Sequence, residues 1–73
     1  LQGQLNVNTA SEAQWQLLPG IGPATAAKIV AYRQRRPFRS TAHLMRVKGI
    51  GKKTYQRIRP YLTLTGETTL APG

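Results

Sequence analysis

The chain has 73 residues, of which 40% are hydrophobic, and no cysteine. It is long enough for one domain only. Without cysteine it can form neither disulfides nor thiolate metal sites. No apolar run approaches the roughly 20 residues of a membrane span, and no signal segment opens the chain, which lacks an initial methionine and is expected to be a fragment or a processed product. Eleven lysines and arginines stand against two acids, Glu12 and Glu67, so the formal net charge is +9.

Residues 1–10 are expected to form an N-terminal arm, because their asparagines favour turns and extended backbone. Ser11 is a good N-cap, and Gln14 stands three positions later, as in a capping box. This pattern predicts a short helix that runs to about residue 18 and is ended by Pro19 and the following glycine.

Proline and serine positions delimit the rest of the chain. Pro23 suits the first turn of a helix, Pro37 ends one, and Ser40 is the N-cap of another. The expected segments are helices over 23–35, 41–46 and about 51–59, a last helical turn at 61–62, and a mobile tail rich in threonine and glycine over 63–73. The sequence therefore predicts an all-α fold, a compact bundle of about five short helices.

The tripeptide Gly-Ile-Gly occurs at residues 20–22 and again at 49–51, an offset of 29 residues that the surroundings share. Such repetition indicates one structural unit used twice. The matching pairs include Thr25 with Thr54, Ile29 with Ile58, Tyr32 with Tyr61, and Trp15 with Leu44. We expect the isoleucines to lie in the core, the tyrosines to pack there with exposed hydroxyls, and the tryptophan to serve packing.

Each Gly-Ile-Gly is expected to join two helices and to bind an anion. Gly20 can adopt a positive φ, Ile21 can point inward, and Gly22 carries no side chain where the next helix begins. The first N–H groups of a helix lack internal partners and suit a phosphate. The second hairpin repeats this design and adds three ammonium groups, those of Lys48, Lys52 and Lys53.

Charge supports this interpretation. Ten of the eleven basic residues lie between Arg33 and Arg59, and one-sided clustering favours a polyanionic partner, with nucleic acid first and an anionic membrane surface second. The alternatives are a solvated surface and a Gly-Ile-Gly that is only a tight turn. A dinucleotide-binding loop does not fit, because no strand precedes either hairpin and threonines occupy the third glycine position.

Catalysis is not expected. The chain contains no aspartate, and its two glutamates are far apart in sequence, whereas acid–base chemistry needs positioned titratable groups. His43 stands alone on a helix expected to be exposed, without the spacing of a metal site. We therefore expect no enzyme, no catalytic residue and no metal.

The order of these motifs resembles the tandem helix-hairpin-helix domain, and in particular the ComEA family of competence proteins. The matching stretches, which span roughly residues 5–64, are Leu5-Asn6-Val7-Asn8-Thr9-Ala10, Leu17-Leu18-Pro19-Gly20-Ile21-Gly22-Pro23-Ala24, Ile29-Val30-Ala31-Tyr32-Arg33, Pro37-Phe38-Arg39-Ser40 and Val47-Lys48-Gly49-Ile50-Gly51. The Asn-Val-Asn-Thr-Ala opening is the specific part.

The resemblance implies a SAM-like tandem domain over residues 11–62, with hairpins near 18–23 and 47–52 related by a pseudo-twofold axis. In that family the hairpins bind phosphates of both strands across the minor groove of duplex DNA, with little sequence preference. The implied DNA-binding residues are Gly20, Ile21, Gly22, Ala24 and Lys28 for one unit, and Lys48, Gly49, Ile50, Gly51, Lys52, Lys53 and Arg57 for the other.

The resemblance also implies a role in DNA uptake during natural transformation, in the periplasm or at the cell surface, together with other uptake proteins. The alternative is a DNA-binding module of a repair or processing protein, which would be cytoplasmic. We expect a monomer that needs no cofactor; a monovalent cation held by hairpin carbonyls is the one exception that relatives of this fold suggest.

Overall fold

The structure is a computed structural model that describes all 73 residues. Its first helix begins after the N-cap residue Ser11, as the capping-box pattern predicts. The Ser11 hydroxyl accepts a hydrogen bond from the backbone N–H of Gln14 at 3.1 Å, and the Gln14 side chain accepts one from the Ser11 N–H at 2.9 Å. Helix α1 (Glu12–Trp15) is a single turn. It is shorter than expected, because residues 16–20 form turns rather than further helix.

The remaining helices lie close to their expected positions. They are α2 (Pro23–Arg35), the 3-10 helix η1 (Thr41–Arg46), α3 (Lys52–Ile58) and the 3-10 turn η2 (Arg59–Tyr61). Pro23 starts α2, and the Ser40 hydroxyl accepts from the Ala42 N–H at 3.2 Å to cap η1. A membrane-crossing helix, long and apolar throughout, is not found among them.

Two short strands modify the expected all-α bundle. Strand β1 (Leu5–Asn6) pairs in parallel with β2 (Leu62–Thr63), which directly follows η2. The structure is thus a helix-rich globule with a small two-stranded sheet, and a bundle of about five helices is not confirmed. Local sequence signals do not reveal this pairing, because the two partners stand at opposite ends of the chain.

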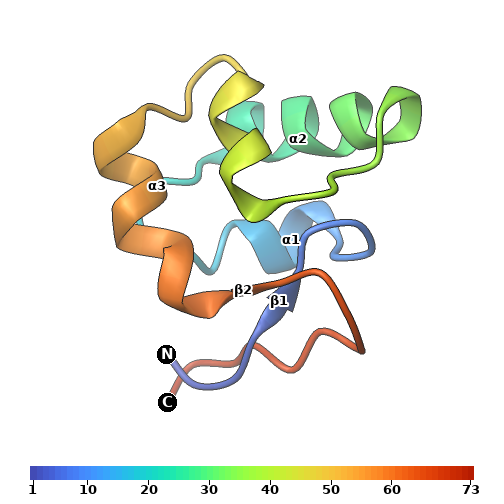
Figure 1. Ribbon diagram of the computed structural model, residues 1–73. Helices are drawn as coiled ribbons and strands as arrows, with labels where there is room; N and C mark the ends of the chain where they lie inside the picture. Colours follow the sequence, from blue (N-terminus) through green and yellow to red (C-terminus); the bar gives the residue numbers. More distant parts are fainter.

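The C-terminal segment also differs from the mobile tail that we expected. Leu70 is only 7% exposed and belongs to the core. The backbone of the N-terminal arm holds the segment: the Thr69 N–H donates to the Gln4 carbonyl at 2.7 Å, and Gln2 exchanges two bonds of 2.9 Å with Ala71. Figure 1 accordingly shows both termini side by side at the lower edge of the molecule.

The core follows the 29-residue repeat. Five matched pairs are buried in both copies: Trp15 with Leu44, Leu18 with Val47, Ile21 with Ile50, Ala26 with Tyr55, and Ile29 with Ile58. The packing roles expected for the isoleucines and the tryptophan are therefore confirmed. Tyr32 and Tyr61 are half-buried against this core, and the Tyr32 ring stacks on buried Phe38 with the ring centroids 5.3 Å apart.

The two asparagines of the arm hold distant segments in place. The Asn8 side chain bonds both backbone groups of Phe38, accepting from its N–H at 2.7 Å and donating to its carbonyl at 2.9 Å. The buried Asn6 amide donates to the Gly66 carbonyl at 2.8 Å. Arg33 donates to the Val7 carbonyl at 3.3 Å, and partial burial lowers its pKa by desolvation. The arm is therefore part of the folded unit.

Replacing Leu70 by alanine tests the order of the C-terminal segment. Because its side chain is buried, Leu70→Ala should lower the free energy of unfolding by about 2–3 kcal/mol, measured by chemical denaturation. Leu64→Ala is the matched control, since Leu64 is 37% exposed and should change stability by less than about 0.5 kcal/mol. Equal effects of the two substitutions would contradict the packed position of Leu70.

Candidate nucleic-acid interface

The two Gly-Ile-Gly corners have the same backbone geometry. Gly20 has a φ of 83° and Gly49 a φ of 106°, a region that residues with a side chain rarely adopt. The N–H group of the following isoleucine closes each turn, from Ile21 to the Leu18 carbonyl at 3.3 Å and from Ile50 to the Val47 carbonyl at 3.1 Å. Both isoleucines are buried. The expected conformation of the corners is confirmed.

Each corner packs against the helix of the other unit. A Cβ atom at Gly49 would lie 3.1 Å from the Thr25 hydroxyl oxygen on α2, and one at Gly20 would lie 3.5 Å from the Thr54 methyl group on α3. The contacts are reciprocal, as a twofold relation between the units requires. They place the two corners, and therefore the starts of α2 and α3, next to each other.

The glycines that begin these helices are open to the outside. Gly22 and Gly51 are N-caps with φ of −91° and −90°, an extended backbone that any residue adopts, and a Cβ atom at either would meet nothing within 4 Å. Apart from the general preference for glycine at an N-cap, neither backbone conformation nor internal packing explains a glycine there. The absence of a side chain instead lets an external group approach both helix starts closely.

The backbone amides at these starts are free to bind that group. Neither helix has a side-chain N-cap hydrogen bond, so the N–H groups of the first turn, including those of Ala24 and Lys53, have no partner within the helix. Both residues are exposed. Unpaired donors at the positive end of a helix dipole favour an anion.

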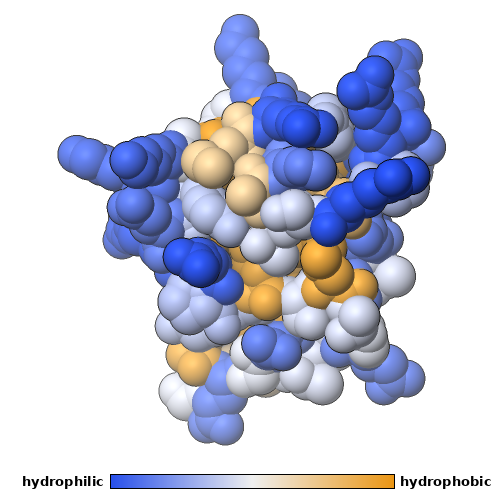
Figure 2. Space-filling view, in the orientation of Figure 1, coloured by the Kyte–Doolittle hydropathy of each residue, from blue (hydrophilic) through white to orange (hydrophobic).

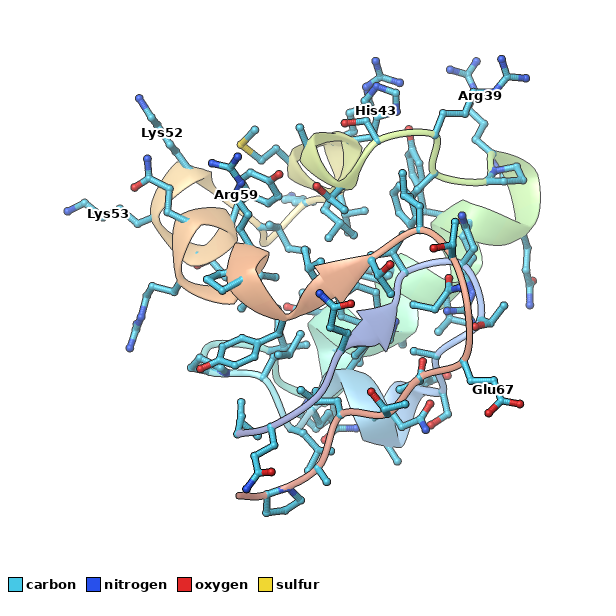
Figure 3. The ribbon with its side chains drawn as sticks, turned by 60° about the horizontal axis from the view of Figure 1, so that its bottom comes forward. Arg39, His43, Lys52, Lys53, Arg59 and Glu67 are labelled. Carbon is cyan, nitrogen blue, oxygen red and sulfur yellow. The ribbon has the colours of Figure 1, made fainter.

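Cationic side chains surround the second corner. Lys48, Lys52 and Lys53 are exposed there, and Figure 3 shows Lys52 and Lys53 extending outward from the start of α3. The first corner has Pro19 and Pro23 at two equivalent positions. The two corners thus share backbone geometry but differ in charge.

The structure brings together some of the predicted basic side chains. Lys28 of α2 and Lys48 of the second hairpin line one hollow of about 380 Å³, although they stand 20 positions apart in the chain. Arg57 is exposed on α3 and does not contribute to this hollow. The predicted residues therefore form two hairpin corners, one shared cationic hollow and one separate arginine.

Sequence reasoning missed a group of arginines beside this hollow. Arg35 and Arg46 line it too, and they also line a second hollow of about 330 Å³ together with Arg36, Arg39 and His43. In the sequence these arginines counted only as part of the basic cluster between Arg33 and Arg59. The clustering of basic residues was the available signal, but their convergence depends on the packing of η1 beside α2.

Acidic and metal-binding side chains do not gather anywhere on the molecule. Neither glutamate lines either hollow, and there is no group of three or more His, Cys, Asp or Glu side chains that could hold a metal ion.

Comparison with known proteins agrees with this geometry and with the resemblance noted in the sequence. The sequence model of the helix-hairpin-helix motif family matches residues 2–63. ComE operon protein 1 of Bacillus subtilis is 34% identical over 61 residues, which are 82% of this chain and 30% of that protein. An uncharacterised protein of Haemophilus influenzae is 41% identical over 58 residues, 77% of this chain and 52% of that protein.

A match of similar length and identity is found in a third relative, whose name refers to a family of enzymes. The endonuclease/exonuclease/phosphatase family domain-containing protein 1 of Rattus norvegicus is 40% identical over 60 residues, 81% of this chain but 10% of that protein. The chain thus spans from a tenth to about half of the length of these relatives.

Alanine substitutions at Gly49 and Gly51 distinguish the structural role of the turn from that of the open helix start. Gly49→Ala should lower the free energy of unfolding by about 1–3 kcal/mol, because its φ is positive and Thr25 is close. Gly51→Ala should change it by less than about 1 kcal/mol, since only the N-cap preference is affected. Thermal or chemical denaturation measures both. A larger loss at Gly51 would mean that this glycine is required by the fold.

Proposed function

Because this chain belongs to the helix-hairpin-helix family, we propose that it binds double-stranded DNA through the phosphates of both strands, without sequence preference. The observation that carries this proposal is the pair of uncapped helix starts, at Gly22 and Gly51, held side by side by reciprocal contacts between the units. Two adjacent anion sites on one rigid unit suit a ligand with regularly spaced phosphates.

Backbone amides supply the contacts in this proposal. Those of Gly20, Ile21, Gly22 and Ala24 bind one strand, and those of Gly49, Ile50, Gly51 and Lys53 bind the other. Lys48, Lys52 and Lys53 add charge at the second hairpin, with Lys28 and Arg57 on the helices that follow the two corners. Phosphate contacts carry no base information, so the binding is independent of sequence.

The proposed activity is binding rather than catalysis. The chain has no aspartate. Glu12 lies on α1 and Glu67 on the C-terminal segment, and both are exposed side chains on different parts of the fold. The proposal therefore includes no general acid or base.

The cellular role proposed here is DNA uptake during natural transformation, at the cell surface or in the periplasm and together with other uptake proteins. The similarity to a ComE operon protein supports it. A DNA-binding module of a processing protein is the second candidate, because an endonuclease/exonuclease/phosphatase family domain-containing protein matches this chain at 40% identity over 60 residues. The parent open reading frame decides between them by encoding either an export signal or an enzymatic domain.

Removing charge at the second hairpin tests the DNA contact. If the five basic residues of the proposed site neutralise about five phosphates, they contribute a slope of about −4 to −5 to log K against log salt concentration. Lys52→Ala combined with Lys53→Ala should make the measured slope shallower by about 2 and weaken binding equally for duplexes of different sequence. An unchanged slope would remove the second hairpin from the site.

A side chain at the open helix start tests the close approach of the phosphate. Gly51→Val should abolish most duplex binding while helix content stays nearly intact, because a Cβ atom at this position meets no protein atom within 4 Å and the side chain would occupy the proposed place of the phosphate. Binding is measured by fluorescence anisotropy and helix content by circular dichroism.

Competition between duplex and single-stranded DNA at matched salt should favour the duplex; equal competition would contradict a site that holds two strands.

A further inference from the structure

The basic residues do not follow the repeat that governs the fold. Lys28 and Arg57 are the only basic pair at the 29-residue offset. The positions equivalent to Arg35, Arg46 and Lys48 are occupied by Leu64, Leu17 and Pro19. The surfaces that the two units present at equivalent places therefore differ, one cationic and the other largely apolar.

On the cationic side, the two hollows join into one surface. Arg35 and Arg46 line both of them. We call the combined surface the arginine track; it consists of Lys28, Lys48, Arg35, Arg46, Arg36 and Arg39, with His43 beside the last two. It begins at the second hairpin and ends where α2 ends. The track runs along α2 from Lys28 to Arg36, which follows the last residue of the helix, so it spans eight positions and is about 12 Å long.

The fold itself does not account for this cluster. Arg33 shows what a structural arginine does here, because it is half-buried and donates to the Val7 carbonyl. Arg35, Arg36, Arg39 and Arg46 are instead exposed, and their side chains make no hydrogen bond to the rest of the molecule.

Opposing charge is also missing from the track. Figure 3 shows Arg39 and His43 on the same side of the molecule as Lys52, whereas Glu67 projects from the C-terminal segment. Figure 2 shows strongly hydrophilic side chains projecting along the upper part of the molecule, where Figure 1 places α2 and η1. Adjacent cations repel one another, so this arrangement raises the energy of the free protein and is relieved by an anion.

We propose that the arginine track holds the phosphate backbone of one DNA strand beyond the second hairpin. This inference rests on the proposed function and adds an asymmetry to it. A track of about 12 Å corresponds to about three to four nucleotides of one strand at 3.4 Å each. Guanidinium groups bind phosphate oxygens through paired donors. The strand at the second hairpin is thus held over a longer distance than the strand at the first.

Substitutions at the far end of the track test the proposal without touching the hairpins. Arg36→Gln with Arg39→Gln removes the charge of two exposed side chains and leaves them polar. With a duplex of about 20 base pairs, the slope of log K against log salt should become shallower by about 2, and the affinity near 0.1 M salt should fall about tenfold or more. Fluorescence anisotropy at several salt concentrations measures both quantities.

A charge-matched variant excludes a general effect of net charge. Leu1→Glu with Ala13→Glu changes two exposed residues, and both double variants reduce the formal charge from +9 by two. The control should retain nearly the full slope. If the two double variants weaken binding equally, the track is not a contact and the inference is overturned.

The hairpin variant Lys52→Ala with Lys53→Ala distinguishes a failure of the track proposal from a failure of the proposed function. Loss of binding in the hairpin variant, with the track variant like the wild type, would overturn the track alone. No binding of duplex by the wild type would overturn both. Additive losses in slope from the two variants, together with NMR shifts at residues 35–46 on titration with the duplex, would support the track.

Discussion

The reciprocal contact between each threonine and the opposite glycine corner is the constraint on which the interface depends. Gly20 and Gly49 turn the chain through a positive φ, Thr54 and Thr25 lie against them, and at Gly49 a Cβ atom would crowd the threonine hydroxyl. Each contact joins the helix of one unit to the corner of the other. The distance between the two helix starts is therefore set by core packing, and a ligand that needs both starts binds without ordering a loop first.

Features encoded within a few residues could be predicted from the sequence. The capping box at Ser11, the proline at the start of α2 and the buried isoleucines of the two units all follow from local spacing, and the repeat doubled the evidence for the isoleucines. Where local rules compete, the prediction was less accurate. α1 is shorter than expected, and residues 41–46 form a 3-10 helix.

Features that depend on distant partners could not be predicted in this way. The C-terminal segment looked mobile because threonine and glycine carry no periodic signal, yet the hydroxyl of Thr69 accepts from the Gln4 N–H across 65 positions. The asparagines of the arm helped to identify the family from the sequence. Their structural role, hydrogen bonding to the backbone of Phe38 and Gly66, could not be predicted from it. The convergence of Arg35 and Arg46 likewise exists only in the folded chain.

The contrast between repeated backbone and unrepeated charge has a physical origin. The corners and the core must repeat, because a change there opens a cavity or strains a turn. Exposed positions such as Arg46 and its equivalent Leu17 can diverge, since surface substitutions cost little stability. Charge on one side raises affinity for a phosphate backbone without adding base contacts. The two strands of a duplex are themselves related by approximate twofold axes, so an unevenly charged protein can bind in either orientation and still show no sequence preference.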